Sequence, residues 1–172
     1  MTRRAAPSAG RGRLKLRRTN ARDLPTLVEH RRRMWEEIGG PTRAELDRAD
    51  PAYRRWVVRE TRAHRFIGFL VEDAKGRAAG SGAVWLQPAQ PRPGRLSRLH
   101  MPYILSMFTE PEFRGRGVAS RLVRAMVRWA TLHGYRRIFL HASSMGHPVY
   151  ATLGFSDGNE MRLELPFRRA SR

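Results

Sequence analysis

The sequence contains no cysteine, and this absence excludes several kinds of site at once. Without thiols the chain forms no disulfide, binds no metal through thiolate ligands and has no cysteine nucleophile. It also has no apolar run near the ~20 residues that a transmembrane helix needs. No apolar stretch follows Arg3 and Arg4, so we expect neither a secretory nor a twin-arginine signal. These absences favour a protein of the reducing cytoplasm.

Acidic residues and lysine are both scarce. The chain has 15 acidic against 34 basic residues, a formal net charge of +19, and only Lys15 and Lys75 are lysine. So high a share of arginine is typical of coding bias as much as of a binding surface. A basic surface attracts phosphates, nucleic acids and acidic molecules over long distances. Binding to nucleic acid or to the ribosome therefore stays open as a minor alternative.

Two regions of the chain differ in composition. Residues 1–12 are small, basic and rich in glycine and proline, which predicts a disordered arm. Residues 13–172 are predicted to form a single domain, because this length allows one sizeable core and 41% of the whole chain is hydrophobic.

Hydrophobic periodicity predicts both helices and strands in this domain. Asp23 is predicted to be the N-cap of the first helix, Gly39 and Gly40 follow its end, and Pro51 predicts a break in the second helix. The expected strands are 14–18, 65–73, 77–87, 103–109, 137–142 and 159–165, and the expected helices are 24–38, 42–61, 117–132 and a short one within 147–155. The prolines of residues 88–95 predict a loop.

This order of elements indicates an α/β or α+β domain, in which helices flank a mixed β-sheet. Residues 103–142 read as a strand–helix–strand crossover. Such crossovers connect parallel strands, so the strands at its two ends are expected to be parallel neighbours.

The stretch FTEPEFRGRGVASRL, residues 108–122, places two glycines where the third long helix begins. A helix start offers unpaired N–H groups and a positive dipole end, and glycine lets a phosphate approach them closely. A Walker A loop is excluded, because no lysine follows the glycines. A dinucleotide fingerprint lacks its third glycine here, and Arg136 and Arg137 stand where its acidic residue belongs. Only an NADP-binding variant of that fingerprint stays open. The residues that remain after Gly117 are too few for the doubly wound sheet that usually carries it.

A third pattern fits the same stretch. Arg114-x-x-Gly117-x-Ala119 resembles the R/Q-x-x-G-x-G/A signature of the GCN5-related N-acetyltransferase (GNAT) family. Pro111 precedes the signature at the family's usual spacing, and Tyr150-x-x-x-Gly154-Phe155 is similar to the family's Y-x-x-x-G-F. The motif-bearing resemblance covers residues 103–155, and the order of elements extends it to most of the chain.

The resemblance implies a GNAT-like sheet with a splayed parallel strand pair that binds acyl-CoA. The pantetheine arm would pair with main-chain groups of residues 107–109, facing the strand at 138–142. Backbone N–H groups of residues 115–120 would hold the pyrophosphate. The cofactor would be acetyl-CoA, and the residues implied to bind it are Met107, Phe108, Thr109, Arg114, Gly115, Arg116, Gly117, Val118, Ala119, Ser120 and Ser143.

The implied reaction is direct transfer of an acetyl group to a primary amine, with no metal and with Tyr150 as the general acid. A phenol has an ordinary pKa near ~10 and a thiol near ~8.5, so the proton donation is mildly uphill. The general base stays open, because Tyr103 stands where some relatives carry a glutamate. The carboxylates and imidazole considered for this role are His100, Glu110, Glu72 and Asp73, and each is better explained as a surface or loop residue.

The acceptor stays open as well. Trp35, Glu36 and Glu37 at the end of the first helix and the loop at 87–102 are candidates to line its pocket, and His141 is a candidate cofactor contact. A non-catalytic acyl-CoA sensor on the same fold is the main alternative to an enzyme. The oligomeric state stays open too, with a homodimer as one alternative, since dimers are common in folds of this kind.

Overall fold

The computed structural model describes residues 13–91, 93 and 99–163. The expected disordered arm of residues 1–12 lies outside the described residues, and so do parts of the 88–95 loop and of the expected 159–165 strand.

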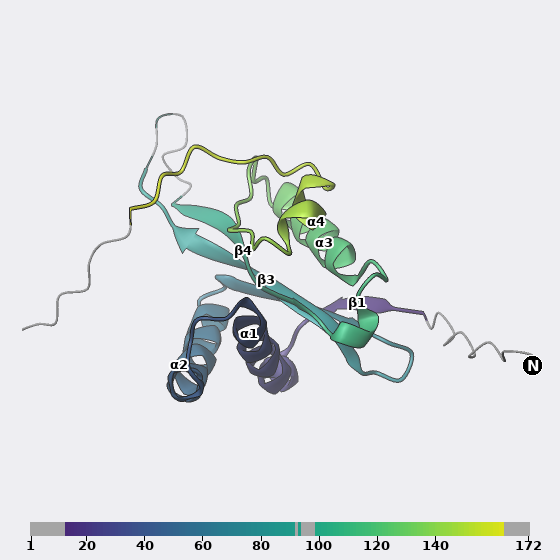
Figure 1. Ribbon diagram of the computed structural model, residues 1–172. Helices are drawn as coiled ribbons and strands as arrows, with labels where there is room; N and C mark the ends of the chain where they lie inside the picture. Colours follow the sequence, from purple (N-terminus) through teal and green to yellow (C-terminus); the bar gives the residue numbers. More distant parts are fainter. Residues whose placement is uncertain (1–12, 92, 94–98, 164–172) are drawn as a thin grey trace, which may run out of the picture.

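One sheet organises the described structure. Its strands are β1 (Lys15–Arg18), β2 (Phe66–Glu72), β3 (Ala78–Pro88) and β4 (His100–Thr109), antiparallel in the order β1-β2-β3-β4. Helices α1 (Leu24–Ile38) and α2 (Arg43–Arg62) cover one face, and α3 (Val118–Leu132) and α4 (His147–Ala151) lie over the other (Figure 1). This arrangement confirms the predicted fold class, and it confirms the first four strands to within a few residues.

Two apolar layers hold the helices to the sheet. On one side Leu122 and Met126 of α3 are fully buried against Val71 and Val84 of the sheet. On the opposite face of the sheet, apolar residues of α1 and α2 pack on Phe66 and Ala83. Burial of one such aliphatic side chain stabilises the fold by ~1.5–3 kcal/mol. The apolar residues of α3 recur at helical spacing, and they form the face that packs on the sheet.

Strand β4 contains a bulge that the sequence did not predict. Leu105 pairs with Ala83 and Phe108 with Ser81, so β4 has one more residue than β3 over this interval. Ser106 absorbs the extra residue with a φ of 53°, and its hydroxyl accepts a hydrogen bond from Tyr53 at 3.2 Å. The bulge reverses the alternation of side chains beyond it, which re-aims the end of β4.

Helix α2 runs without a break through Pro51, so the predicted interruption is wrong. A proline inside a helix leaves one carbonyl without its N–H partner. Pro51 lies on the exposed side of α2, where water can satisfy that carbonyl. The N-terminus of α2 is stabilised by a capping box that Thr42 and Glu45 form.

The two later strands are shorter than predicted or absent. Residues 137–142 make one parallel bridge, Tyr103 to Phe139, which confirms the parallel neighbours but not a regular strand. Residues 159–163 form no strand, and the side chains of Met161 and Leu163 are 96% and 82% exposed. An alternating pattern gives a strand only where a partner edge is available, and no described strand lies beside this segment.

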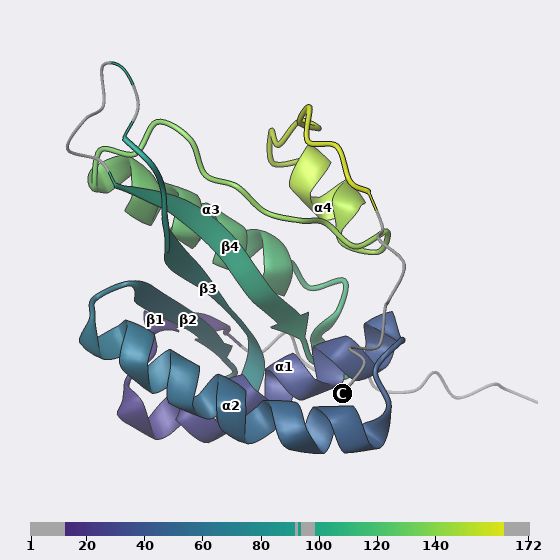
Figure 2. The same ribbon diagram turned by 90° about the vertical axis from the view of Figure 1, so that its left-hand side faces the viewer.

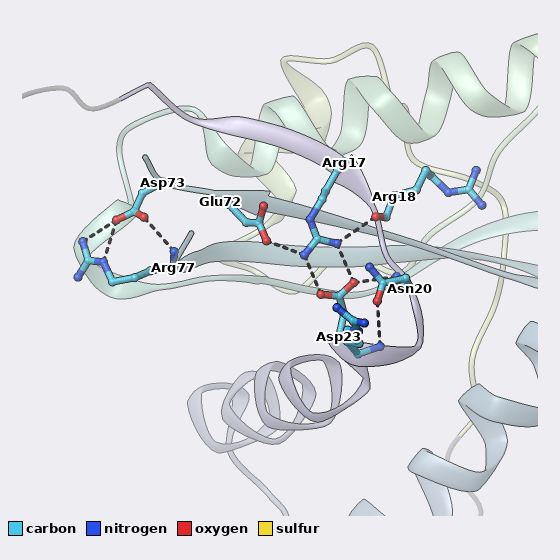
Figure 3. A network of polar contacts seen from close by, with 8 residues as sticks. Arg17, Arg18, Asn20, Asp23, Glu72, Asp73 and Arg77 are labelled. Carbon is cyan, nitrogen blue, oxygen red and sulfur yellow. Dashed lines mark hydrogen bonds and ion pairs between the residues drawn. The ribbon is translucent and has the colours of Figure 1, made fainter. Parts of the chain in front are cut away.

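An ion-pair network fixes the start of α1 to the sheet (Figure 3). Arg17 of β1 contacts Asp23 at 2.7 Å and Glu72 of β2 at 2.5 Å. Asp23 also accepts the N–H of Asn20, so its carboxylate closes the turn before α1 and does not cap the helix amides. Arg17 lowers the pKa of Asp23. The predicted cap residue therefore acts on the preceding turn.

Glu60 of α2 gives a stability prediction. Glu60 is 3% exposed, and its carboxylate accepts hydrogen bonds from Arg65 at 2.7 Å and from the indole of Trp85 at 3.1 Å. The hydrogen bonds from Arg65 contribute most to lowering its pKa to about 2. We expect Glu60→Gln to lower the free energy of unfolding by about 1–3 kcal/mol, because Arg65 loses a charge-assisted partner.

The pH dependence of this effect has a fixed sign. The folded pKa lies below the unfolded value, so the stabilisation is complete above the unfolded pKa and is lost as pH falls toward about 2. Urea unfolding should show the difference between wild type and Glu60→Gln narrowing over that range. As a control, Glu36→Gln removes an exposed pair with Arg32 and should change stability by less than ~0.5 kcal/mol. A difference for Glu60→Gln that is constant with pH would contradict the assignment.

Candidate active site

The turn before α3 is built to leave backbone N–H groups accessible. Gly117 is the N-cap of α3 with a φ of 75°, and Gly115 has a φ of 70°. No side chain caps this helix end, so the amides of its first turn have no partner inside the helix. A Cβ built on either glycine meets no atom within 4 Å, so the space over the turn is open.

The residues that follow Gly117 divide between core and surface. Val118 is buried, so only its main chain is accessible to a ligand, whereas Ala119 and Ser120 are half-buried. A Cβ on Gly80 of β3 would lie 2.7 Å from the side chain of Val118. Gly80 therefore lets α3 approach the sheet closely at this end, which fixes the position of the turn.

The side chain of Arg114, the first residue of the motif, joins three elements. Its guanidinium donates to the carbonyl of Thr109 at 3.1 Å and to the carboxylate of Glu37 at 2.5 Å. It thus links the turn to the end of β4 and to the last turn of α1. Glu37 was a candidate for the acceptor pocket, and the structure pairs it with Arg114. Glu36, the other candidate carboxylate, pairs with Arg32 at 3.1 Å.

At the end of β4 the side chains of Met107 and Phe108 are packed against other residues, whereas the main chain on one edge is unpaired within the described part of the chain. Met107 packs on the α3 side, because a Cβ on Gly82 would lie 2.3 Å from its sulfur and 2.8 Å from the Cε of Met126. Phe108 is buried on the α1 side, with its ring 5.0 Å from the ring of His30. Beyond Ile104, which donates to Phe139 at 2.7 Å, no backbone hydrogen bond of the described residues joins β4 to residues 137–142.

Tyr150 lies on α4, on the same side of the sheet as α3. In Figure 2 the segment that follows α3 runs beside β4 before the chain reaches α4. Tyr150 is half-buried, its ring lies 5.8 Å from that of Phe155, and burial raises the pKa of its phenol. Ser143 closes the turn before α4, because its hydroxyl accepts the N–H of Gly146 at 3.2 Å. That turn sets the direction from which α4 presents Tyr150.

Three of the four candidate bases are held in ion pairs. Glu72 contacts Arg17, and Asp73 contacts Arg77 at 2.8 Å and closes the β2–β3 turn (Figure 3). Glu110 contacts Arg33 at 2.6 Å and the ring of His30 at 3.2 Å. Arginine therefore occupies an oxygen of each of these carboxylates. His100, the fourth, lies half-buried at the start of β4.

Two histidine clusters had no signal in the sequence. His30 is buried, with Ser81 at 2.8 Å from Nδ1 and Glu110 near Nε2, and burial lowers the pKa of its ring. His141, considered only as a cofactor contact, hydrogen-bonds the phenol of Tyr103 and approaches Glu160. These partners are far apart in the chain, and only the folded sheet brings them together.

The described residues bring together no group of three or more His, Asp or Glu side chains that could hold a metal ion. None of the helices in the described part of the chain is long and apolar enough to cross a membrane.

Comparison with known proteins gives a consistent result. The family model described as acetyltransferase (GNAT) family matches residues 24–155. Glucosamine 6-phosphate N-acetyltransferase of Trypanosoma brucei brucei is 30% identical over 91 residues, which are 52% of this chain and 59% of that protein. This chain therefore spans less than two thirds of the length of that curated relative.

Two crystal structures are similar over nearly the whole chain. A GCN5-related N-acetyltransferase from Ralstonia eutropha has a TM-score of 0.78 and 24% identity, covering 88% of this chain and 98% of that one. A predicted acetyltransferase with acetyl-CoA, from Clostridium acetobutylicum, has a TM-score of 0.78 and 25% identity, covering 90% and 96%.

Proposed function

This chain belongs to the GNAT acetyltransferase family, and from that premise we propose that it moves an acetyl group from acetyl-CoA directly onto a primary amine. The chain is an acyltransferase and its cofactor is acetyl-CoA. The direct transfer, the amine acceptor and the roles of individual residues are the proposal.

One observation supports the cofactor site above all others. Gly115 and Gly117 hold the turn before α3 in a left-handed conformation, and the space that a Cβ would enter at each is open. Uncapped N–H groups at a helix start form a site for phosphate. The residues therefore fit a pyrophosphate, with the amides of Gly115 to Ser120 as donors and Arg116 supplying a charge.

The main chain of residues 107–109 is proposed to hold the pantetheine arm. Its edge away from β3 has no main-chain partner among the described residues, and the side chains of Met107 and Phe108 are occupied in packing. An extended chain adds to such an edge through backbone hydrogen bonds. The bound cofactor supplies a thioester, whose carbonyl is open to attack by an amine and whose sulfur must be protonated as it leaves.

Tyr150 is proposed to give that proton. Its raised pKa keeps the phenol protonated well above neutral pH, so the donor form is the form present. Ser143 acts on this group by closing the turn that precedes α4.

For the acceptor we propose a small primary amine, and glucosamine 6-phosphate is the first compound to test. The relative that bears that name covers only part of this chain. The strongly basic composition also suits an acceptor that carries a phosphate.

The proposed function is tested by two measurements. Calorimetric titration with acetyl-CoA, butyryl-CoA and NADPH should show binding of acyl-CoA alone. Thiol release from acetyl-CoA should then depend on a primary amine, tested with glucosamine 6-phosphate and a broad amine panel. Binding of NADPH without acyl-CoA would overturn the cofactor site. Acetyl-CoA binding with no amine turned over would replace the enzyme with an acyl-CoA sensor.

A further inference from the structure

Three polar side chains are linked by hydrogen bonds near the point where main-chain pairing between β4 and residues 137–142 ends. The hydroxyl of Tyr103 hydrogen-bonds Nδ1 of His141, and the two rings lie 5.6 Å apart between centroids. Nε2 of His141 lies 3.4 Å from Oε1 of Glu160. The order phenol, imidazole, carboxylate matches that of a proton relay, in which the carboxylate orients the ring and stabilises its charged form.

These side chains lie on the opposite side of the sheet from Tyr150. Ile104, Ile138 and Leu140 pack against the core under α3, and Tyr150 packs against the same cluster. Side chains alternate between the faces of an extended segment. Tyr103 precedes Ile104 and His141 follows Leu140, so both belong to the side that α1 and α2 cover.

An acetyl transfer uses an acid and a base at different atoms. The sulfur leaves while the amine attacks, so the acid for the sulfur and the base for the amine serve atoms on different sides of the carbonyl. Tyr150 on the α3 side is the proposed acid. An amine that enters from the α1 and α2 side would therefore give its proton to a group on that side.

We propose that Tyr103, His141 and Glu160 accept the proton that the acceptor's ammonium group must lose before it attacks. This inference rests on the proposed function. In the step, an N–H of the ammonium gives its proton to the oxygen of Tyr103. The O–H proton of Tyr103 passes to Nδ1 of His141. The amine is left with a free electron pair, Tyr103 is again neutral, and His141 becomes an imidazolium beside Glu160.

The surroundings of each group favour this direction. The titratable groups that contact His141 are Tyr103 on β4 and Glu160 on the segment after α4. Burial, followed by the charge of Glu160, raises the pKa of Tyr103, so its phenol stays protonated and passes a proton on. The His141 side chain is 74% exposed, and it returns its proton to water after each cycle.

The competing bases are worse placed. Glu72, Asp73 and Glu110 are each held by an arginine. His30 is buried and hydrogen-bonded at both ring nitrogens.

The test compares the pH dependence of His141→Gln and Tyr103→Phe with that of wild type, using the amine that wild type acetylates best. Near neutral pH we expect kcat/KM to fall about 100-fold or more in both variants. The deficit should shrink as pH rises toward the ordinary pKa of the amine used, about 10 for a lysine-like amine and about 8 for an α-amine, because the free amine then needs no base. Imidazole added to His141→Gln should restore part of the rate. His133→Gln, at the end of α3, is the matched control and should keep the wild-type profile.

The outcomes separate this inference from the proposed function. If wild type binds acetyl-CoA but acetylates no amine, the proposed function fails and the relay with it. If wild type acetylates an amine and the two variants keep its rate, the relay alone is overturned. A loss that is equal at every pH, or that comes with lost acetyl-CoA binding by calorimetry, shows a merely structural role and also overturns it.

Discussion

Replacing Gly117 with glutamate is expected to weaken the binding of acetyl-CoA by about 100-fold or more, which is ~3 kcal/mol. Gly117 is the N-cap residue of α3, and no side chain of the described residues bonds the amides of the first turn. A side chain added at Gly117 enters the open space over these amides. The new carboxylate would occupy the proposed phosphate site and repel the phosphates themselves. Calorimetric titration with acetyl-CoA measures the loss, and thermal unfolding shows whether the variant is folded.

Gly76→Glu is a matched control for this prediction. Gly76 lies in the turn between β2 and β3 with a φ of 76°, against 75° for Gly117, and its Cβ space is also open. Both variants therefore carry the same added charge and a similar left-handed strain of ~1–2 kcal/mol. Only Gly117→Glu should lose the cofactor. Equal affinities in the two folded variants would show that phosphate does not bind at the start of α3.

The glycines before α3 show what a sequence predicts well. Helix α3 was predicted from its apolar spacing, and the turn from Gly115 and Gly117, because both features arise within one short stretch of chain. The structure places all of these residues as expected. Local sequence determines such features, since a left-handed turn needs glycine and a buried helix face needs regular apolar spacing.

The features that were missed depend on partners far along the chain. The bulge at Ser106 is held by Tyr53, which belongs to a different element. Likewise Asp23 does not cap α1, because Arg17 and Asn20 take its carboxylate. Residues 137–142 look like a full strand, yet pairing stops after one bridge. A propensity for extended structure is realised only where a neighbouring edge follows the same path, and the bulge in β4 changes that path.

Arg114 shows that a residue of a cofactor motif can also hold elements of the fold together. The signature predicts a contact with the cofactor, and the structure pairs the guanidinium with Glu37 and with the carbonyl of Thr109. Together with Arg33 and Glu110, this contact connects α1 to both ends of the turn between β4 and α3. The helix that borders the proposed acceptor side is thus joined directly to the proposed phosphate site.

Tyr150→Phe is expected to lower kcat by about 100-fold or more while leaving the affinity for acetyl-CoA unchanged. The phenyl ring keeps the packing against Phe155 and the close approach to Gly146, so only the hydroxyl is lost. Steady-state kinetics with the best amine, together with calorimetry, separates the two effects. Tyr135→Phe removes a hydroxyl near the end of α3 and is the control.

The pH profile distinguishes a proton donor from a packing residue. The pKa of Tyr150 is raised by burial, so wild-type kcat should hold beyond the ordinary phenol value of about 10 and fall only where the phenol ionises. That alkaline fall should be absent in Tyr150→Phe. His141→Gln should keep the alkaline fall and should be slow near neutral pH, where most of the amine is protonated. The two ends of the pH profile then depend on groups on opposite faces of the sheet. A Tyr150→Phe variant with wild-type kcat would leave the sulfur to take its proton from water, and Tyr150 would be a core residue of α4.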